Sequence, residues 1–417
     1  MAFSCKMHRV APIDAKDNLS TNERPRQRRG VKEFFRKYFL EGQKLDEAVQ
    51  NEIDFNRKNL PFHEKYRKFI AVLIPFIFFQ LCWWSLAIRY DLFQLFPTRY
   101  ALSVTMVFGA FIAGSTSEGG GAVAFPVMTL LLHISPEVSR DYSLMIQSVG
   151  MASSSFAIMW MKIKIEYHSI IFSSLGAALS IILGVQFWDD VLTGPQKKMI
   201  FVSIWFSFAI SLLILNLQRK RIVYDSIPHF NWWKALVLFG TGFFGGLLSA
   251  FSGSGVDICS FSMLTLLFRV SEKVATPTSV ILMFLNTCVG FYWRQLMMSG
   301  ISTLAWEYFA VSVPVVVTMS PIGAFVSSHV HRQVLAVFIY VLETAALIGF
   351  LVTRPAVMLV IVGAIIIAIG TAFFFGISQL GRIISDRIES KRLDIHDAST
   401  SSPQQNSTVS STFDLGA

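Results

Sequence analysis

Long apolar segments alternate with short polar stretches from about residue 70 to residue 377. A helix needs about 20 mostly apolar residues to cross the hydrocarbon core of a bilayer. Eight segments approach or reach this length, and we expect full membrane spans at residues 70–89, 142–161, 169–187, 198–217, 277–292, 304–328, 333–351 and 357–376. The pattern therefore predicts an all-α polytopic membrane protein.

Two further apolar segments, 99–114 and 232–251, run into breaks that are rich in glycine and serine. A short apolar segment follows each break, at 122–133 and 256–268, and it is too short to cross a bilayer alone. Such a segment forms either the return arm of a re-entrant hairpin or half of a discontinuous helix. Broken helices at matching places in two halves of a chain indicate the binding site of a secondary transporter.

A shift of 136 residues lays the first break and its flanks on the second. The identical pairs are then Gly109/Gly245, Gly119/Gly255, Phe125/Phe261, Thr129/Thr265, Leu130/Leu266, Leu131/Leu267, Ser135/Ser271, Val138/Val274 and Ser143/Ser279. Apolar composition alone does not readily pair two glycines, a threonine and two serines. We therefore interpret the chain as two repeats.

Composition excludes an ordinary soluble domain, because 53% of the 417 residues are apolar and only 15% are charged. The formal charge of +9 is concentrated before residue 69, which favours a cytoplasmic flank and not a nucleic-acid surface. The first 60 residues lack the apolar core of a signal peptide. The four cysteines show no spacing typical of disulfides or zinc, and we expect no metal and no cofactor.

The composition changes divide the chain into five segments. They are a basic cytoplasmic N-terminal segment (1–68), a first transmembrane repeat (69–217), a cytoplasmic linker (218–231), a second transmembrane repeat (232–377) and a disordered cytoplasmic tail (378–417). Clusters of Lys and Arg favour the cytoplasmic side of a membrane. Placing every cluster there makes both termini cytoplasmic and puts residues 188–194 on the opposite side. The two hairpins then approach from opposite faces, so the repeats are inverted; the plasma membrane is the favoured location.

The breaks have the chemistry of an anion site. A helix that begins inside the bilayer presents unpaired backbone N–H groups and the positive end of its dipole. Glycine lets a ligand approach that backbone, and hydroxyl groups add donors. The expected substrate-binding residues here are Ser115, Ser117, Gly119, Gly120, Gly121, Ser252, Gly253, Ser254 and Gly255. The alternative is that small residues only allow close helix packing, which fits Gly109, Gly245 and Gly246 well.

Two acidic residues, Glu118 and Asp257, lie within the breaks. Ionisable groups at membrane depth are costly and usually functional, so each is a candidate for carrying a proton that is coupled to transport. The alternative is that each caps the N-terminus of its short helix, where an acid is favoured. Three weaker candidates are Glu307, Asn286 and Glu343, and the alternative for Glu343 is a pairing with another buried polar group.

At these residues the chain resembles the sulfite exporter TauE/SafE family of anion transporters, over roughly residues 70–377. The stretches that carry the resemblance are Gly114–Pro126 and Gly245–Ser279, including Ala-Thr-Pro-Thr-Ser at 275–279. The resemblance implies that Thr278 and Ser279 also contribute to substrate binding. The chain departs from the family pattern at Glu118, where an apolar residue is usual, and at Val256 and Asp257, where glycines would continue.

The resemblance implies a secondary transporter for a small anion, such as sulfite, an organosulfonate or a related sulfur-containing anion, working by alternating access. A carrier for a small carboxylate and an anion channel remain as alternatives. An intramembrane enzyme or a receptor is disfavoured, because the spans hold no His-x-x-x-His pair and no Asp dyad, and because the chain is a repeat. The expected partners are the anion, the lipid bilayer and a coupling proton or cation, with no nucleic acid.

Overall fold

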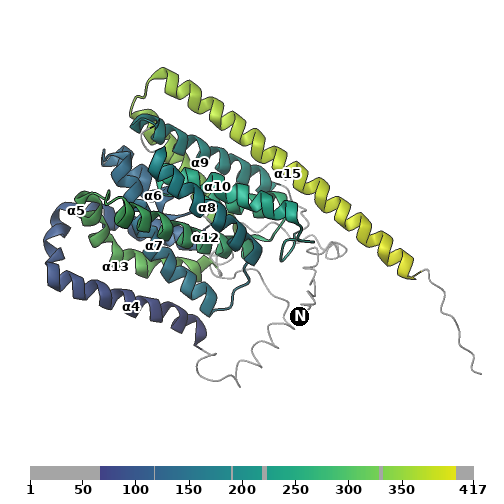
Figure 1. Ribbon diagram of the computed structural model, residues 1–417, viewed down its shortest axis with the longest axis horizontal. Helices are drawn as coiled ribbons and strands as arrows, with labels where there is room; N and C mark the ends of the chain where they lie inside the picture. Colours follow the sequence, from purple (N-terminus) through teal and green to yellow (C-terminus); the bar gives the residue numbers. More distant parts are fainter. Residues whose placement is uncertain (1–65, 117, 189–190, 218–222, 328–331, 401–417) are drawn as a thin grey trace, which may run out of the picture.

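The computed structural model describes residues 66–116, 118–188, 191–217, 223–327 and 332–400 (Figure 1). Within these ranges the regular structure is helical, apart from an isolated bridge between Tyr224 and Val270. Eight of the described helices are long and apolar enough to cross a membrane, which confirms the predicted all-α polytopic membrane protein. They are α4 (Arg67–Tyr90), α5 (Phe96–Ser115), α8 (Tyr167–Phe187), α9 (Gly194–Leu217), α10 (Trp232–Ser252), α12 (Glu272–Tyr292), α13 (Thr303–Ser327) and α15 (Val357–Thr400).

The membership of this set differs from the eight expected spans. It includes α5 and α10, which were expected as arms of hairpins, and it omits α7 (Pro136–Trp160) and α14 (Arg332–Val352). Helix α7 is more polar than the others because it runs through the centre of the protein, where most of its side chains are buried against α12 and α13. Burial inside protein is what allows a polar helix at membrane depth.

Both Gly-rich segments form hairpins. Helix α5 is followed by the short helix α6 (Gly120–Pro126), and α10 is followed by α11 (Val256–Ser262). Each short helix folds back along the long one. A Cβ added at Gly109 would lie 3.2 Å from Val123, and one added at Gly245 would lie 3.2 Å from Cys259. These two glycines therefore allow close packing within the hairpins, as their alternative interpretation expected.

The two repeats match in detail at the offset seen in the sequence. Short helices α6 and α11 each end in one π-helical turn, at Val127–Leu131 and Met263–Leu267. The Thr129 hydroxyl donates to the carbonyl of residue 125 at 2.7 Å, and the Thr265 hydroxyl donates to the carbonyl of residue 261 at the same distance. The matched threonines thus hold the same turn in both repeats.

Helices from the two repeats interleave. Helix α8 of the first repeat packs along α10, the long arm of the second hairpin, and α13 of the second repeat packs along α5, the long arm of the first. Glycines permit both close approaches, since a Cβ at Gly242 would lie 2.0 Å from the Ser173 carbonyl oxygen and one at Gly323 would lie 2.2 Å from that of Phe111. Each hairpin is therefore supported by the other repeat.

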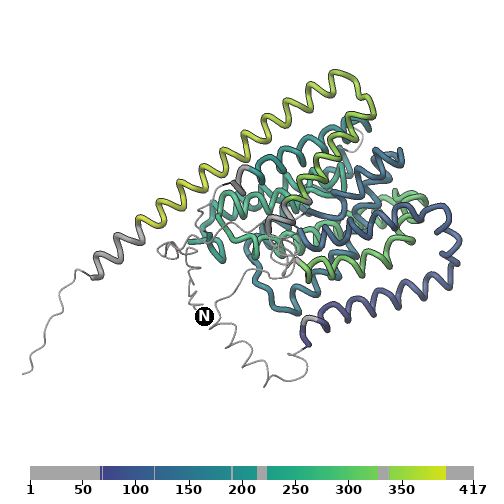
Figure 2. The backbone as a smooth tube through the Cα atoms, turned by 180° about the vertical axis from the view of Figure 1, so that it is seen from behind, coloured from purple at the N-terminus to yellow at the C-terminus, as the bar shows by residue number. Residues whose placement is uncertain are grey.

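Helices α4 and α15 lie at opposite edges of the bundle (Figures 1 and 2). Their apolar windows are only 17% and 11% buried, as expected for helices that face lipid. Helix α15 continues to Thr400 and projects beyond the bundle, which corrects the expectation of disorder for residues 378–400; residues 401–417 lie outside the described residues. Charged side chains one turn apart, such as Arg382 and Asp386, favour helix over coil in this segment.

Candidate functional site

The two hairpins bring their Gly-rich tips together. In the first hairpin, Gly119 has extended backbone angles and immediately precedes α6. In the second, α10 ends at Gly253, whose φ of 80° lies in the left-handed region that glycine adopts without strain. The tips are buried, and a Cβ added at Gly121 would lie 3.0 Å from the Cβ of Ser254. Residues of the two repeats thus meet at a single place inside the protein.

A hydrogen bond joins the tips directly. The backbone N–H of Gly119 donates to Oδ2 of Asp257 at 2.7 Å. The hydroxyl of Ser254 donates to the same oxygen at 3.1 Å, and the backbone N–H group of Ile258 also faces this carboxyl group. Asp257 therefore faces the N-terminus of its own short helix, as the capping interpretation expects, and in addition it binds the backbone of the other repeat.

This geometry changes the interpretation of the predicted anion site. The backbone N–H group of Gly119 is directed at the junction of the tips, and a carboxyl group of the protein itself accepts its hydrogen bond. The carboxyl group of Asp257 stands at a place that suits an oxyanion, because it is lined by an N–H group and a hydroxyl group. An incoming anion has to share these donors with Asp257 or displace it.

Glu118 is placed differently from Asp257. It is completely buried, and neither carboxyl oxygen accepts a hydrogen bond from a backbone N–H group or a hydroxyl group. The capping interpretation therefore does not describe it. Its carboxyl group instead lies within hydrogen-bonding reach of the carboxyl group of Glu343, which comes from α14 and is also completely buried.

Gln147 of α7 lies between the tips and was not predicted. Its Nε2 donates to the carbonyl oxygens of Gly253 at 2.8 Å and Ser143 at 2.9 Å. Because both partners are acceptors, the amide nitrogen faces them and Oε1 points the other way, toward Gly119. This oxygen is buried and accepts no hydrogen bond. The sequence signal that could have found Gln147 is a lone amide within the expected span 142–161.

The predicted hydroxyl donors are mostly engaged within their own helices. Ser115 donates to the carbonyl of Ile112 at 3.1 Å, Ser252 to that of Leu248 at 3.0 Å, and Ser279 to that of Thr276 at 2.8 Å. Thr278 donates to Val274 and accepts from the backbone N–H of Glu166, so it faces the connection between α7 and α8. Ser117 lies outside the described residues. The Ser254 hydroxyl, by contrast, is directed at the junction of the tips.

The predicted glycines differ in the space around them. A Cβ at Gly119 would lie 2.2 Å from Gln147 Oε1, and one at Gly255 would lie 2.6 Å from the Cβ of Leu248. Substitution there disturbs packing as well as backbone access. At Gly120 the nearest atom is 3.5 Å away, which is ordinary contact. Gly120 is therefore the position where access to the backbone can be tested without a clash.

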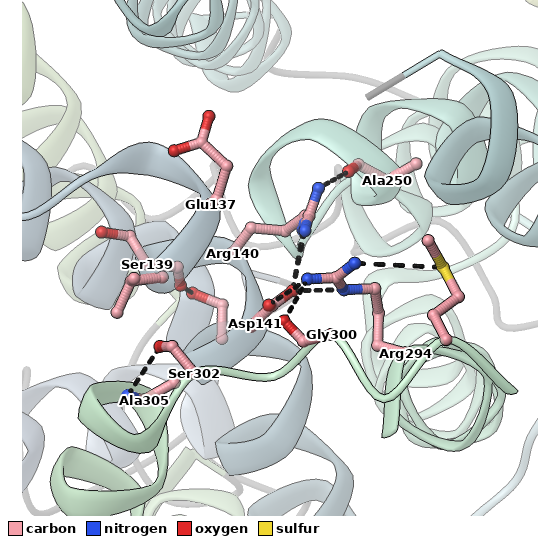
Figure 3. A network of polar contacts seen from close by, with 12 residues as sticks. Glu137, Ser139, Arg140, Asp141, Ala250, Arg294, Gly300, Ser302 and Ala305 are labelled. Carbon is pink, nitrogen blue, oxygen red and sulfur yellow. Dashed lines mark hydrogen bonds and ion pairs between the residues drawn. The ribbon is translucent and has the colours of Figure 1, made fainter. Parts of the chain in front are cut away.

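A buried ion-pair network lies beside the second tip (Figure 3). Arg294, just beyond α12, binds Asp141 of α7 with two hydrogen bonds of 3.0 and 2.7 Å. Arg140 binds the same carboxylate at 2.9 Å and donates to the carbonyl of Ala250 at 3.4 Å. Removing one member of such a buried pair typically costs about 3–5 kcal/mol. The network was not predicted, and it fastens the first repeat to the second next to the site.

The sequence was compared with protein families, curated proteins and solved structures. A family model described as sulfite exporter TauE/SafE matches residues 101–350, which include both hairpin tips, Gln147 and Glu343. No curated protein and no solved structure gives a match.

Proposed function

Since this chain belongs to the sulfite exporter TauE/SafE family, we propose that it is a secondary membrane transporter for a small anion, with its binding site where the two hairpin tips meet. Sulfite, an organosulfonate or a related sulfur-containing anion is the favoured substrate. The protein is an integral multi-pass membrane protein by its eight long apolar helices.

The hydrogen bond between Gly119 and Asp257 is the observation that carries this proposal. It supports the idea that the tips favour an oxyanion, because a backbone donor of one repeat faces a carboxyl oxygen of the other. Sulfite and sulfonates, like a carboxylate, carry negatively charged oxygen atoms that accept hydrogen bonds. In the proposed binding step, the anion takes over the N–H group of Gly119 and the hydroxyl group of Ser254 from Asp257.

The packing of the helices supports alternating access. Each hairpin lies against a helix of the other repeat, as described for α8 with α10 and for α13 with α5. A rocking motion of these paired elements would open the tips first toward one face and then toward the other. A site at the junction of two repeats is where such a motion changes access most.

A small carboxylate is the second candidate substrate, and one observation favours it. The group that contacts the Gly119 N–H in this structure is itself a carboxyl group. A planar carboxylate and a pyramidal sulfite present oxygens at similar spacing, so the tip donors alone do not separate them.

Counterflow in proteoliposomes tests the proposal. Vesicles loaded with unlabelled sulfite should take up labelled sulfite faster than vesicles loaded with sulfate or chloride, because a carrier exchanges its own substrate. Acetate and taurine tested in the same way distinguish a carboxylate carrier from a sulfonate carrier. A channel would show no acceleration by internal substrate.

The variant Ser254→Ala removes a hydroxyl group at the site and should slow exchange. Ser211→Ala is its matched control, since the buried Ser211 hydroxyl donates to a carbonyl oxygen within α9, at 2.8 Å. Equal exchange rates in both variants would argue against binding at the tips, and the absence of counterflow with every anion would refute the carrier function.

A further inference from the structure

Glu118 and Glu343 form a pair of carboxyl groups deep inside the protein. They come from different elements, the first hairpin and α14, and α14 packs directly against α6. Both side chains are completely buried. Among the described residues, no Lys, Arg or His forms an ion pair with either one, and no backbone N–H or hydroxyl group donates to their four oxygens.

Two ionised carboxylates in this arrangement would repel each other without compensation. Water is excluded, so neither charge is solvated, and each oxygen would lack a donor. One shared proton removes the repulsion and supplies one of the missing donors, because a protonated carboxyl group donates an O–H···O hydrogen bond to its ionised neighbour. The contact between the two groups is therefore the contact expected of a carboxyl–carboxylate pair.

Among the described residues, the surroundings of the pair contain a further acidic group and no basic group. Asp257 of α11 is the other titratable group that acts on both glutamates, while α7 presents the uncharged Gln147. The unpartnered Oε1 of Gln147 points toward Gly119, next to Glu118, and is a further acceptor there. Among the described residues, no group of three Cys, His, Asp or Glu side chains could hold a metal ion. The ligand that this environment fits is thus a proton.

We propose that Glu118 and Glu343 form a proton-binding site, and that the proton they share is the coupling ion of anion transport; the coupling part rests on the proposed function. The proton reduces the negative charge beside Asp257, so an anion can enter the tips when the pair is protonated. After the site opens to the other face, anion and proton leave together. With a monovalent anion and one proton, no net charge crosses the membrane.

Infrared spectroscopy of the purified protein tests the proton site without any substrate. A buried protonated carboxyl group gives a C=O stretching band that is separate from ionised carboxylates. We expect this band at neutral pH in the wild type, its loss in both Glu118→Gln and Glu343→Gln, and its retention in Glu307→Gln. Glu307 is the matched control, because it pairs with Arg99 at 2.9 Å and is partly exposed.

The same measurement can overturn the proposal. A wild type without the band, or a band that persists in both variants, would show that the pair holds no proton. Loss in only one variant would place the proton on one glutamate and refute sharing. The double variant Glu118→Gln/Glu343→Gln, in which two amides can hydrogen-bond each other, replaces either single variant that does not fold.

Coupling is tested with labelled isethionate, which stays a monoanion across the pH range of the assay. An inward proton gradient of one pH unit, acidic outside, should drive about a tenfold accumulation of isethionate by the wild type if one proton accompanies each anion. Each glutamine variant should exchange isethionate but accumulate none. Exchange without accumulation in the wild type would refute coupling. Absence of exchange with sulfite, isethionate and acetate would instead refute the proposed function, and the infrared result would still decide the proton site.

Discussion

Replacing Asp257 by alanine is the most direct test of the junction between the tips. The substitution removes the acceptor for the Gly119 N–H group, at 2.7 Å, and for the Ser254 hydroxyl group, at 3.1 Å. Both donors are buried, so they have no access to water in this state. The variant therefore leaves at least these two buried donors unpaired and opens a space the size of a carboxyl group between the repeats.

The expected loss of stability follows from these two donors. A buried donor without a partner costs roughly 1–3 kcal/mol, which gives about 2–6 kcal/mol for the pair. Removing a carboxyl group next to Glu118 and Glu343 relieves repulsion and offsets part of this cost. We therefore expect a loss near the lower limit, about 2 kcal/mol. Asp257→Asn keeps an oxygen acceptor for Gly119 and should cost about half as much.

The assay is thermal unfolding of the purified protein in detergent, followed by size-exclusion chromatography, with and without small anions. Acetate or methanesulfonate should fill the space left in Asp257→Ala and restore its stability. An anion present at 100 times its dissociation constant stabilises by about 2.7 kcal/mol, which is enough to offset the expected loss. Acetamide has the shape of acetate without the charge and is the control ligand.

Three results would refute this reasoning. An unchanged unfolding temperature in Asp257→Ala would show that the two hydrogen bonds contribute little. Equal stabilisation of the wild type and the variant by acetate, or equal effects of acetate and acetamide, would show that no anion site lies at the tips.

Three further predictions concern the hairpins and the topology. Gly120→Ala should fold normally but lower transport per folded protein, because its Cβ has room yet covers the backbone. Gly119→Ala should also lower the yield of folded protein on size exclusion, because its Cβ would lie 2.2 Å from an amide oxygen. Full transport by Gly120→Ala would show that Gly120 does not line the substrate site. Gly253→Ala should lower the unfolding temperature, because a left-handed φ of 80° costs a side chain roughly 1–2 kcal/mol; an unchanged temperature would contradict this. Cysteines placed at Val191 and His229 in a cysteine-free background should react with an impermeant label from opposite sides of the membrane, and reaction from one side would contradict the inverted repeat.

The repeat and its hairpins could be predicted because their signals are local. Glycine and serine in an apolar run break a helix wherever that run lies in the fold. The pair Thr129 and Thr265 marks the same turn in both copies, since each hydroxyl bonds the carbonyl four residues earlier. The roles of Gly109 and Gly245 in packing also follow from position, because each faces the short arm of its own hairpin.

The serine and threonine donors show where such reasoning stops. A hydroxyl group on a helix has a carbonyl oxygen within reach in its own previous turn. Ser115 and Ser279 use that local acceptor, and Thr278 turns toward Glu166. Composition indicates that hydroxyl groups are present in the breaks, but it does not indicate which of them is directed at a ligand.

The sequence by itself determined the membrane class, the two copies and the residues at each tip, because hydrophobic length and helix breaking depend on neighbouring residues. Only the tertiary structure decided which groups meet. Asp257 binds Gly119 across 138 residues, Gln147 enters between the tips from α7, and Glu343 reaches Glu118 from α14. Each of these contacts joins elements far apart in the chain. Their distances depend on how α7 packs against both hairpins and how α14 packs against the first, and the hydrophobic periodicity of the chain does not encode that packing.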